Sequence, residues 1–335
     1  MGVTAPAVTF TAPGEVVVTE VALPDIGRDD VAVRTAYSGI SQGTERWLLT
    51  GRYNHAGDDV AHNYPCFPGY QAAGVVEAVG SQVTDVAPGD HVMLEGTRLP
   101  GDVANPGPGL ASHVGRMVAP RRSVTPVSAT VDLAGAALYR MAAVSRHGVR
   151  LAGVSSGDVV CVIGLGMIGQ MAAQAARRVG AHVIAGDLIP ARVKAAAEHS
   201  ADVAVDVRQT SLADAVREAA PHGADVVIDT TGVSSMFDTC LDLVRYEGRI
   251  CLQGYYPEPI SIDFHPTHLK RATVFFPCGW DAQHDGEIAA DLTSGALAIE
   301  PLITHRFPYT DAAEAYATVV DHPEASIAMV FAWAH

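Results

Sequence analysis

The stretch "CVIGLGMIGQ", Cys161 to Gln170, decides the fold. An apolar run ends at Gly164, and Gly166 and Gly169 complete a GxGxxG spacing directly before an alanine-rich run. In such a motif the first glycine permits a tight turn, the second lets a ligand approach the backbone, and the third lets a helix pack on a strand. The helix N-terminus then offers free N–H groups and the positive end of its dipole to phosphates. The stretch therefore predicts a strand, a turn and a helix that bind a dinucleotide.

A second apolar run, "HVIAGD", ends at Asp187, about twenty residues after the glycines. A carboxylate there accepts hydrogen bonds from ribose hydroxyls and repels a 2′-phosphate, so the sequence favours NAD over NADP. Arg192 lies five residues further along and could bind that phosphate, so NADP is not excluded as a cofactor. The competing interpretation is a Rossmann-like sheet whose glycine turn binds nothing. The predicted cofactor contacts are Gly164, Leu165, Gly166, Met167, Ile168, Gly169, Asp187, Arg192, Thr231 and Gly254.

The rest of the chain divides into two regions with different sequence patterns. Residues 7–120 alternate short β-rich runs with Gly/Pro turns, which is typical of a compact β-rich domain. From about residue 131, runs with helical spacing alternate with apolar strands, which predicts a doubly wound parallel sheet and an α/β fold class. The tail after about residue 285 reads as strand, helix and strand, and its spacing fits either domain.

Composition limits the partners. The net charge of −15 and only two lysines, Lys194 and Lys270, argue against nucleic acid as a partner. The N-terminal "MGVTAPAVTF" lacks the pattern of a signal peptide, and no apolar run is long enough to span a bilayer, so we expect a cytoplasmic protein that acts on a small molecule without membrane contact. The five cysteines contain no CxxC pair, and the fourteen histidines, His55, His62, His265 and His268 among them, form no metal-binding pattern.

The order of parts resembles the medium-chain dehydrogenase/reductase superfamily over essentially the whole chain. The resemblance rests on "YSGISQGTE" (37–45), "PGYQAAGVVEAVG" (68–80), the glycine-rich segment and "FPYTDAAEAYATV" (307–319). It is strongest to the branch of bacteriochlorophyllide dehydrogenases and other biosynthetic alcohol dehydrogenases that lack the usual zinc signature. The resemblance implies an active site in the cleft between domains and a homodimer formed through the late strand "RATVFFPCG". The domains it implies are a GroES-like catalytic domain at 1–128, a Rossmann NAD-binding domain at 129–285 and a return to the catalytic domain at 286–335.

The departures from zinc-dependent relatives concern the metal sites. Where those relatives carry a cysteine ligand, this chain has Ser41, and where they carry Gly-His-Glu it has Gly-Tyr-Gln at residues 69–71. Their third ligand falls at Arg140 or Met141 of this chain. The lobe near residues 95–110 contains none of the four expected cysteines. Because hydroxyl and amide groups do not replace thiolate and imidazole as zinc ligands, we predict neither catalytic nor structural zinc.

Hydride transfer without zinc needs other groups to stabilise charge on oxygen and to move a proton. Tyr70 is the first candidate, because it occupies a former ligand position and its phenol can both donate and accept; the alternative is a tyrosine that only packs. Glu45 is a candidate base, or else a carboxylate that stabilises a helix N-terminus. The predicted catalytic residues are Tyr70, Glu45, Ser41, Thr44 and Tyr53.

Three further residues are predicted to bind substrate. They are Gln71, Arg140 and Tyr64. Gln71 stands where zinc-dependent relatives have a carboxylate, and it keeps the capacity to hydrogen-bond. Arg140 stands near the missing third ligand, where it could bind an anionic or hydroxyl-rich group; the alternative is a surface residue on an amphipathic helix.

These residues predict a zinc-independent, NAD-dependent oxidoreductase that acts on a secondary alcohol or ketone of a hydroxyl-rich metabolite such as a cyclitol, sugar or nucleoside-like compound. One alternative is a zinc-free ene reductase, which delivers hydride to a C=C bond and needs one proton donor. The other is a dinucleotide-binding sensor without catalysis. The product distinguishes the first two, because only carbonyl chemistry changes the hydroxyl count.

Overall fold

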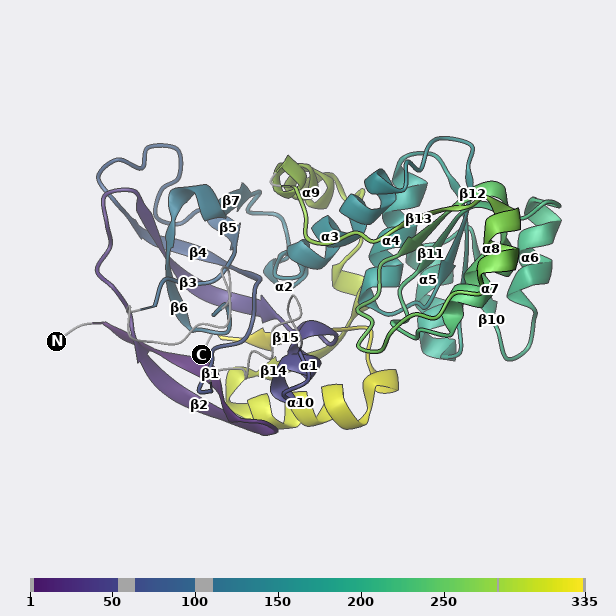
Figure 1. The fold of residues 1–335 in the computed structure, drawn as a ribbon. Coiled ribbons are helices and arrows are strands. Elements are labelled where there is room, and N and C mark those ends of the chain that lie inside the picture. Colours follow the sequence, from purple (N-terminus) through teal and green to yellow (C-terminus); the bar gives the residue numbers. More distant parts are fainter. Residues whose placement is uncertain (1–2, 54–63, 100–110, 282, 334–335) are drawn as a thin grey trace. The chain divides into compact units, whose positions relative to one another are not determined.

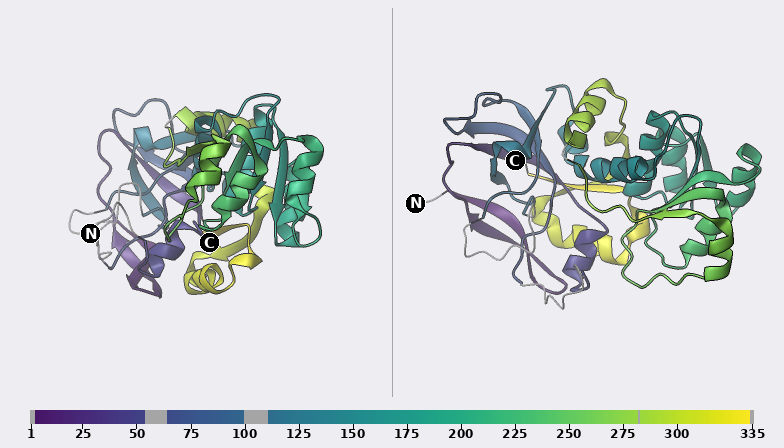
Figure 2. Two further views of the ribbon diagram at one scale, coloured as in Figure 1. Left: turned by 45° about the vertical axis from the view of Figure 1, so that its right-hand side comes forward. Right: turned by 45° about the horizontal axis from the view of Figure 1, so that its top comes forward.

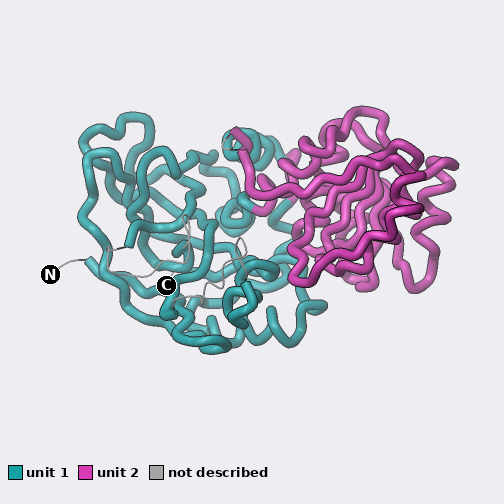
Figure 3. Tube along the Cα trace, viewed as in Figure 1, with its two compact units in different colours: residues 1–140, 285–295, 299–335 teal, residues 141–284, 296–298 magenta. Residues whose placement is uncertain are grey.

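The structure is a computed structural model that describes residues 3–53, 64–99, 111–281 and 283–333. The chain forms two compact units (Figure 3): unit 1 contains residues 1–140, 285–295 and 299–335, and unit 2 contains residues 141–284 and 296–298. No helix among the described residues is long and apolar enough to cross a membrane. Unit 1 therefore begins, is interrupted by unit 2, and is completed by the last part of the chain.

Unit 1 is β-rich. A seven-stranded sheet has the order β14-β15-β3-β4-β5-β7, with β6 paired to β3, and β1 and β2 form a separate antiparallel pair. The strands are β1 (Thr4–Ala12), β2 (Glu15–Ala22), β3 (Asp30–Gly39), β4 (Ala72–Val79), β5 (His91–Leu94), β6 (Arg116–Pro120), β7 (Val124–Val127), β14 (Ile303–Pro308) and β15 (Ala328–Ala332). Its helices are α1 (Thr44–Leu49), α2 (Leu133–Ala136), most of α9 (Gln283–Ser294), and α10 (Ala312–Asp321).

The tail of the chain joins the β-rich unit. Strand β15 pairs antiparallel with β3, with Phe331 opposite Ser38, and β14 pairs parallel with β15. Helix α10 packs against β2 and α1. The structural boundary near residue 140 lies later than the predicted boundary at 128, because Asp132 caps α2 by accepting from the Gly135 N–H at 2.9 Å and α2 packs on β3 and β4.

Unit 2 is a doubly wound parallel sheet, as the sequence predicts. Its six strands run in the order β10-β9-β8-β11-β12-β13, and every pairing is parallel (Figure 1). The strands are β8 (Val159–Ile163), β9 (His182–Asp187), β10 (Val203–Asp206), β11 (Ala224–Asp229), β12 (Val244–Leu252) and β13 (Thr273–Phe275). The helices are most of α3 (Tyr139–Leu151), and α4 (Met167–Arg178), α5 (Pro190–His199), α6 (Leu212–Ala219), α7 (Met236–Leu243) and α8 (Phe264–Lys270).

Helices cover both faces of this sheet (Figure 2). Successive side chains of a strand point to opposite faces, and β8 divides accordingly between two core clusters. Val160 and Val162 pack with the alanines of α4 and with parts of α3 and α5, whereas Cys161 and Ile163 pack with α6 and α7. The central strand is buried on both faces, which is why its sequence is continuously apolar.

Candidate cofactor and catalytic sites

The three glycines of the motif meet different constraints. Gly164 has a φ of +86°, in the left-handed region that favours glycine, and a Cβ added at Gly169 would lie 1.9 Å from the Gly164 carbonyl oxygen. Gly166 is the N-cap of α4, and a Cβ added there would meet no atom within 4 Å. The first and third glycines are thus required by the fold, while the second borders open space at a helix N-terminus, which fits a phosphate group.

The motif lies at the reversal of strand order, where β8 is flanked by β9 and β11. Ligands of such sheets bind beyond the carboxyl ends of the strands at this point. Thr231 and Gly254 reach the same edge: the Thr231 N–H donates to Asp229 Oδ1 at 3.0 Å, and the Gly254 N–H donates to the Asp229 carbonyl at 3.1 Å. The structure brings these two predicted contacts to the edge that carries the glycines.

Asp187 ends β9 and holds the glycine turn. Its carboxylate accepts from the Leu165 N–H at 2.6 Å and from the Ile189 N–H at 2.8 Å, and Arg192 Nη1 lies 3.9 Å from Oδ2. A carboxylate oxygen has a second lone pair, so both oxygens keep the capacity to accept from a ribose hydroxyl. The residue therefore combines a role in the fold with the acceptor chemistry that the motif predicts.

We expect Asp187→Asn to weaken NADH binding by roughly 10- to 100-fold, because a hydrogen bond to a charged group contributes about 1.5–3 kcal/mol. NADPH binding should weaken less, since the variant no longer repels the 2′-phosphate, and fluorescence titration with both cofactors measures the ratio. Asp206→Asn, at the end of neighbouring β10, is the control and should change neither affinity. Equal losses for both cofactors would mean that Asp187 only supports the turn.

Tyr70 and Ser41 meet in unit 1 because Ser41 follows β3 and Tyr70 precedes its antiparallel neighbour β4. The Tyr70 hydroxyl donates to Ser41 Oγ at 2.7 Å. Burial raises the pKa of Tyr70 well above that of an ordinary phenol; hydrogen bonds with Ser41 and Thr44 oppose the shift, and the negative charge of Glu45 adds to it. Tyr70 is therefore a neutral phenol over the physiological pH range.

Glu45 belongs to a buried polar network. Its Oε2 accepts from the Tyr316 hydroxyl at 2.6 Å and lies 3.1 Å from His113 Nε2. His113 Nδ1 lies 2.7 Å from Ser38 Oγ, which also accepts from Trp333 Nε1 at 2.8 Å. Glu45 lies in the first turn of α1, as the alternative interpretation requires, yet it is only 1% exposed. Sequence reasoning missed the other four members of this network, Tyr316, His113, Ser38 and Trp333, because no local motif marks them.

Two further tyrosines of the prediction lie near this network. Tyr53 packs against the apolar cluster around Phe331, and its electrostatic influence slightly raises the pKa of Tyr70. The Tyr64 hydroxyl donates to the Leu48 carbonyl at 2.5 Å, so it supports the end of α1. Gln71 is fully buried, and its backbone carbonyl accepts from the N–H of Gly39 at 3.1 Å.

Arg140 requires a correction, because it is not a surface residue. Its side chain is 1% exposed; Nη1 lies 2.7 Å from Asp285 Oδ1, and Nη2 lies 2.5 Å from Glu95 Oε1 and 2.8 Å from the Tyr139 hydroxyl. The guanidinium also lies over the Tyr139 ring, 4.6 Å from its centroid. These contacts indicate a structural function for Arg140 inside unit 1, and its role in substrate binding stays a prediction.

Histidines outside this network include one group with the composition of a metal site. His147, Asp281 and His284 of unit 2 place ligand atoms within 4.8 Å of one another. Arg150 Nη1 lies 3.1 Å from His284 Nε2, however, and a guanidinium at that distance opposes a bound cation. Of the histidines considered from the sequence, His55 and His62 lie outside the described residues.

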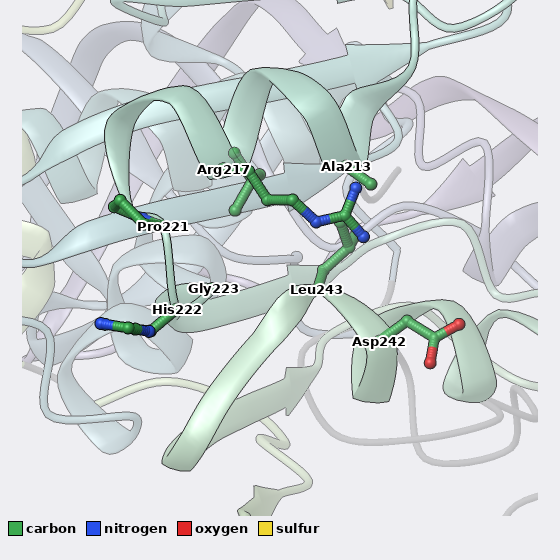
Figure 4. A pocket seen from close by; sticks show the side chains of 8 residues that line it. Ala213, Arg217, Pro221, His222, Gly223, Asp242 and Leu243 are labelled. Carbon is green, nitrogen blue, oxygen red and sulfur yellow. The ribbon is translucent and has the colours of Figure 1, made fainter.

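A surface pocket of unit 2 lies between α6 and α7 (Figure 4). Arg217, His222 and Asp242 line it, together with apolar parts of both helices. Pro221 to Gly223 lead into β11 and Leu243 leads into β12, so the pocket lies at the amino ends of these strands. The glycine motif is at the opposite edge, and the pocket is not the dinucleotide site.

Comparison with protein-family models and curated proteins gives matches over nearly the whole chain. Residues 27–129 match the alcohol dehydrogenase GroES-like domain, and residues 168–293 match the zinc-binding dehydrogenase model. The 2-desacetyl-2-hydroxyethyl bacteriochlorophyllide A dehydrogenase of Cereibacter sphaeroides is 30% identical over 98% of both chains. An L-threonine 3-dehydrogenase of Saccharopolyspora erythraea is 31% identical over 92% of this chain and 94% of its own length.

Solved structures agree in fold. An Escherichia coli oxidoreductase/dehydrogenase of unknown specificity superposes with a TM-score of 0.87 at 23% identity, over 98% of this chain and 99% of that one. A Sinorhizobium meliloti zinc-binding dehydrogenase, bound to NADP, gives 0.83 at 24% identity with the same coverage. At these identities the structures establish the fold alone.

Proposed function

Because this chain belongs to the medium-chain dehydrogenase/reductase family of NAD(P)-dependent enzymes, we propose that it is a zinc-independent oxidoreductase that uses NAD(H). It interconverts a secondary alcohol and a ketone on a polar, hydroxyl-rich biosynthetic metabolite. The observation that carries the proposal is the neutral Tyr70 phenol, hydrogen-bonded to Ser41 at the positions where the family resemblance puts zinc ligands.

The donor set around Tyr70 does not suit zinc. Zinc sites in proteins use thiolate, imidazole and carboxylate ligands, whereas Ser41 and Tyr70 offer hydroxyls and Gln71 offers an amide. The imidazole of His113 is engaged at both ring nitrogens, by Ser38 and Glu45, and the Arg140 guanidinium is engaged by two carboxylates. The proposal therefore assigns stabilisation of the substrate oxygen to hydrogen-bond donors of the protein.

A bound nicotinamide dinucleotide supplies or accepts the hydride. The single hydrogen of the neutral Tyr70 phenol points to Ser41 in the absence of substrate. With substrate bound it points to the substrate oxygen, Ser41 donates to the phenol oxygen instead, and Tyr70 gives up its proton when a carbonyl becomes an alcohol. Ser41 orients the phenol, and Glu45 lies close enough to influence its ionisation. In the unit that carries the glycine motif, the first turn of α4 and Asp187 bind the dinucleotide's phosphates and ribose.

Transfer of label from 4-deuterated NADH to candidate metabolites, followed by mass analysis, tests the reaction. We expect deuterium on a carbon that carries a new hydroxyl, from protein whose zinc content is far below one per chain. Label in a product whose hydroxyl count is unchanged would identify an ene reductase. Tight NADH binding without any labelled metabolite would identify a sensor, and stoichiometric zinc needed for turnover would refute zinc independence.

We also propose a cytoplasmic homodimer formed through β13, the edge strand of the unit 2 sheet. Phe276 directly follows β13, whereas Phe264 and Leu269 lie on α8, the helix before it. All three are exposed, Phe264 to 74%. Exposed apolar groups of this size beside an open strand edge favour association. The expected mass in solution is twice 35.0 kDa, and a monomer mass by light scattering would contradict the dimer.

A further inference from the structure

The Glu45 network contains an asymmetry between the two carboxylate oxygens. Oε2 has two partners, Tyr316 and His113, whereas Oε1 is buried and has no hydrogen-bond partner within the described part of the chain. Buried polar atoms are nearly always paired, so an unpartnered carboxylate oxygen in a candidate active site needs an explanation. The explanation lies in the direction of the hydrogen bonds that reach Oε2.

Residue chemistry favours one order of donors. The Trp333 indole N–H can only donate, so Ser38 Oγ accepts from it and has its own hydrogen available for His113 Nδ1. With Nδ1 as acceptor, a neutral His113 carries its proton on Nε2, which then donates to Glu45 Oε2. Tyr316 donates to the same oxygen. In this donor order Tyr316 and His113 both donate to Oε2, so a proton on Glu45 lies on Oε1.

The fold holds this arrangement rigidly. His113 is completely buried, and its ring meets the Phe331 ring edge-on with centroids 5.0 Å apart. Gly69, the glycine that precedes Tyr70, also borders this ring: a Cβ added there would lie 2.9 Å from two ring atoms of His113. The His113 imidazole thus occupies the space that the absent side chain of Gly69 leaves beside Tyr70.

We propose that His113 is a positioning residue for Glu45, which it holds through Oε2 so that Oε1 exchanges with Tyr70 the proton that the substrate gains or loses. This inference rests on the proposed function. In the reducing direction the hydride forms the new C–H bond, the carbonyl oxygen takes the phenol proton of Tyr70, and Tyr70 regains a proton from Glu45 Oε1. Because Oε1 contacts no described hydrogen-bonding group, a water molecule bridges it to the Ser41 hydroxyl. Ser41 gives one proton to Tyr70 as it receives another from the water, and solvent later reprotonates Glu45.

Two variants of His113 separate positioning from packing. In His113→Asn the amide can keep the hydrogen bond that Nδ1 makes with Ser38, but it is too short to reach Glu45. In His113→Gln the longer side chain can donate to Glu45 in place of Nε2. We expect His113→Asn to lower kcat by about tenfold or more, given that acid–base catalysis contributes roughly 10²–10⁴-fold, and to raise the solvent deuterium isotope effect. His113→Gln should recover most of kcat, with KM and the Kd for NADH unchanged in both.

Equal loss in the two variants, or no loss in His113→Asn, would overturn the inference. Nitrogen-15 NMR of histidine-labelled wild-type protein measures which ring nitrogen of His113 carries the proton. This measurement needs neither turnover nor a folded variant. We expect His113 to carry its proton on Nε2, and a proton on Nδ1 alone would refute the donor order. If the protein has no turnover at all, the proposed function fails, while NMR still tests the contact between His113 and Glu45. If Tyr70→Phe loses turnover and His113→Asn does not, only the positioning role of His113 fails.

Discussion

Tyr70→Phe should lower turnover by roughly 10²–10³-fold, the usual cost of removing one preorganised donor from a developing oxyanion. The substitution removes a single oxygen from a partly buried ring and leaves the packing of the ring in place, so the Kd for NADH and the unfolding temperature should stay close to wild type. Steady-state kinetics with the labelled product as readout measures the effect. The same change at exposed Tyr246 of unit 2 is the control.

The pH dependence distinguishes this role from that of an ionised base. Because the pKa of Tyr70 is raised, chiefly by burial, the phenol keeps its proton through neutral and mildly alkaline pH. We therefore expect no loss of reduction rate from phenol ionisation below about pH 10, the ordinary value for tyrosine. Wild-type turnover in Tyr70→Phe would return this residue to a packing role.

Arg140→Met should lower the free energy of unfolding by about 3–5 kcal/mol, the usual cost of removing one partner from a buried ion pair. The variant leaves Asp285 and Glu95, whose side chains are 18% and 28% exposed, without their shared cation. Arg140→Lys should recover only part of the loss, because a single ammonium cannot satisfy both carboxylates as the planar fork does. Urea unfolding followed by circular dichroism measures the change.

A control for Arg140 lies on the surface of the same unit. Arg121 pairs with Asp85 at 2.6 Å, but that carboxylate is largely exposed, so Arg121→Met should cost much less. A kcat that falls in Arg140→Lys without any loss of stability would contradict the structural role and restore Arg140 as a substrate-binding residue. Stability loss without a specific change in KM is the expected result.

The parts of the fold that the sequence predicts well are local. The strand, glycine turn and helix from Val159 to Arg178 are specified by neighbouring residues, and the structure confirms the doubly wound sheet around them. The stretch from residue 132 to 153 reads as helical but divides into α2 and α3. Helix α8 has no clear apolar period, and its residues are exposed or half-buried, so periodicity could not reveal it.

The catalytic candidate could be predicted only in part, for a physical reason. Ser41 and Tyr70 flank adjacent antiparallel strands, and their meeting follows once β3 and β4 are paired. His113 and Tyr316, by contrast, lie 68 and 271 residues from Glu45 in the chain, and only the closed unit brings them together. The partners of Arg140 could not be predicted for the same reason, since they are 45 and 145 residues away in the chain. Long-range pairing of single polar residues leaves no periodic signal.

The interrupted course of unit 1 has a consequence during translation. All of unit 2 has been synthesised by residue 298, so its sheet can form on the ribosome while β14 and β15 are still missing. Until β15 emerges, the edge of β3 from Tyr37 to Gly39 lacks its partner strand, and Ser38 lacks the donor Trp333. A nascent chain should therefore complete unit 2 early and unit 1 last.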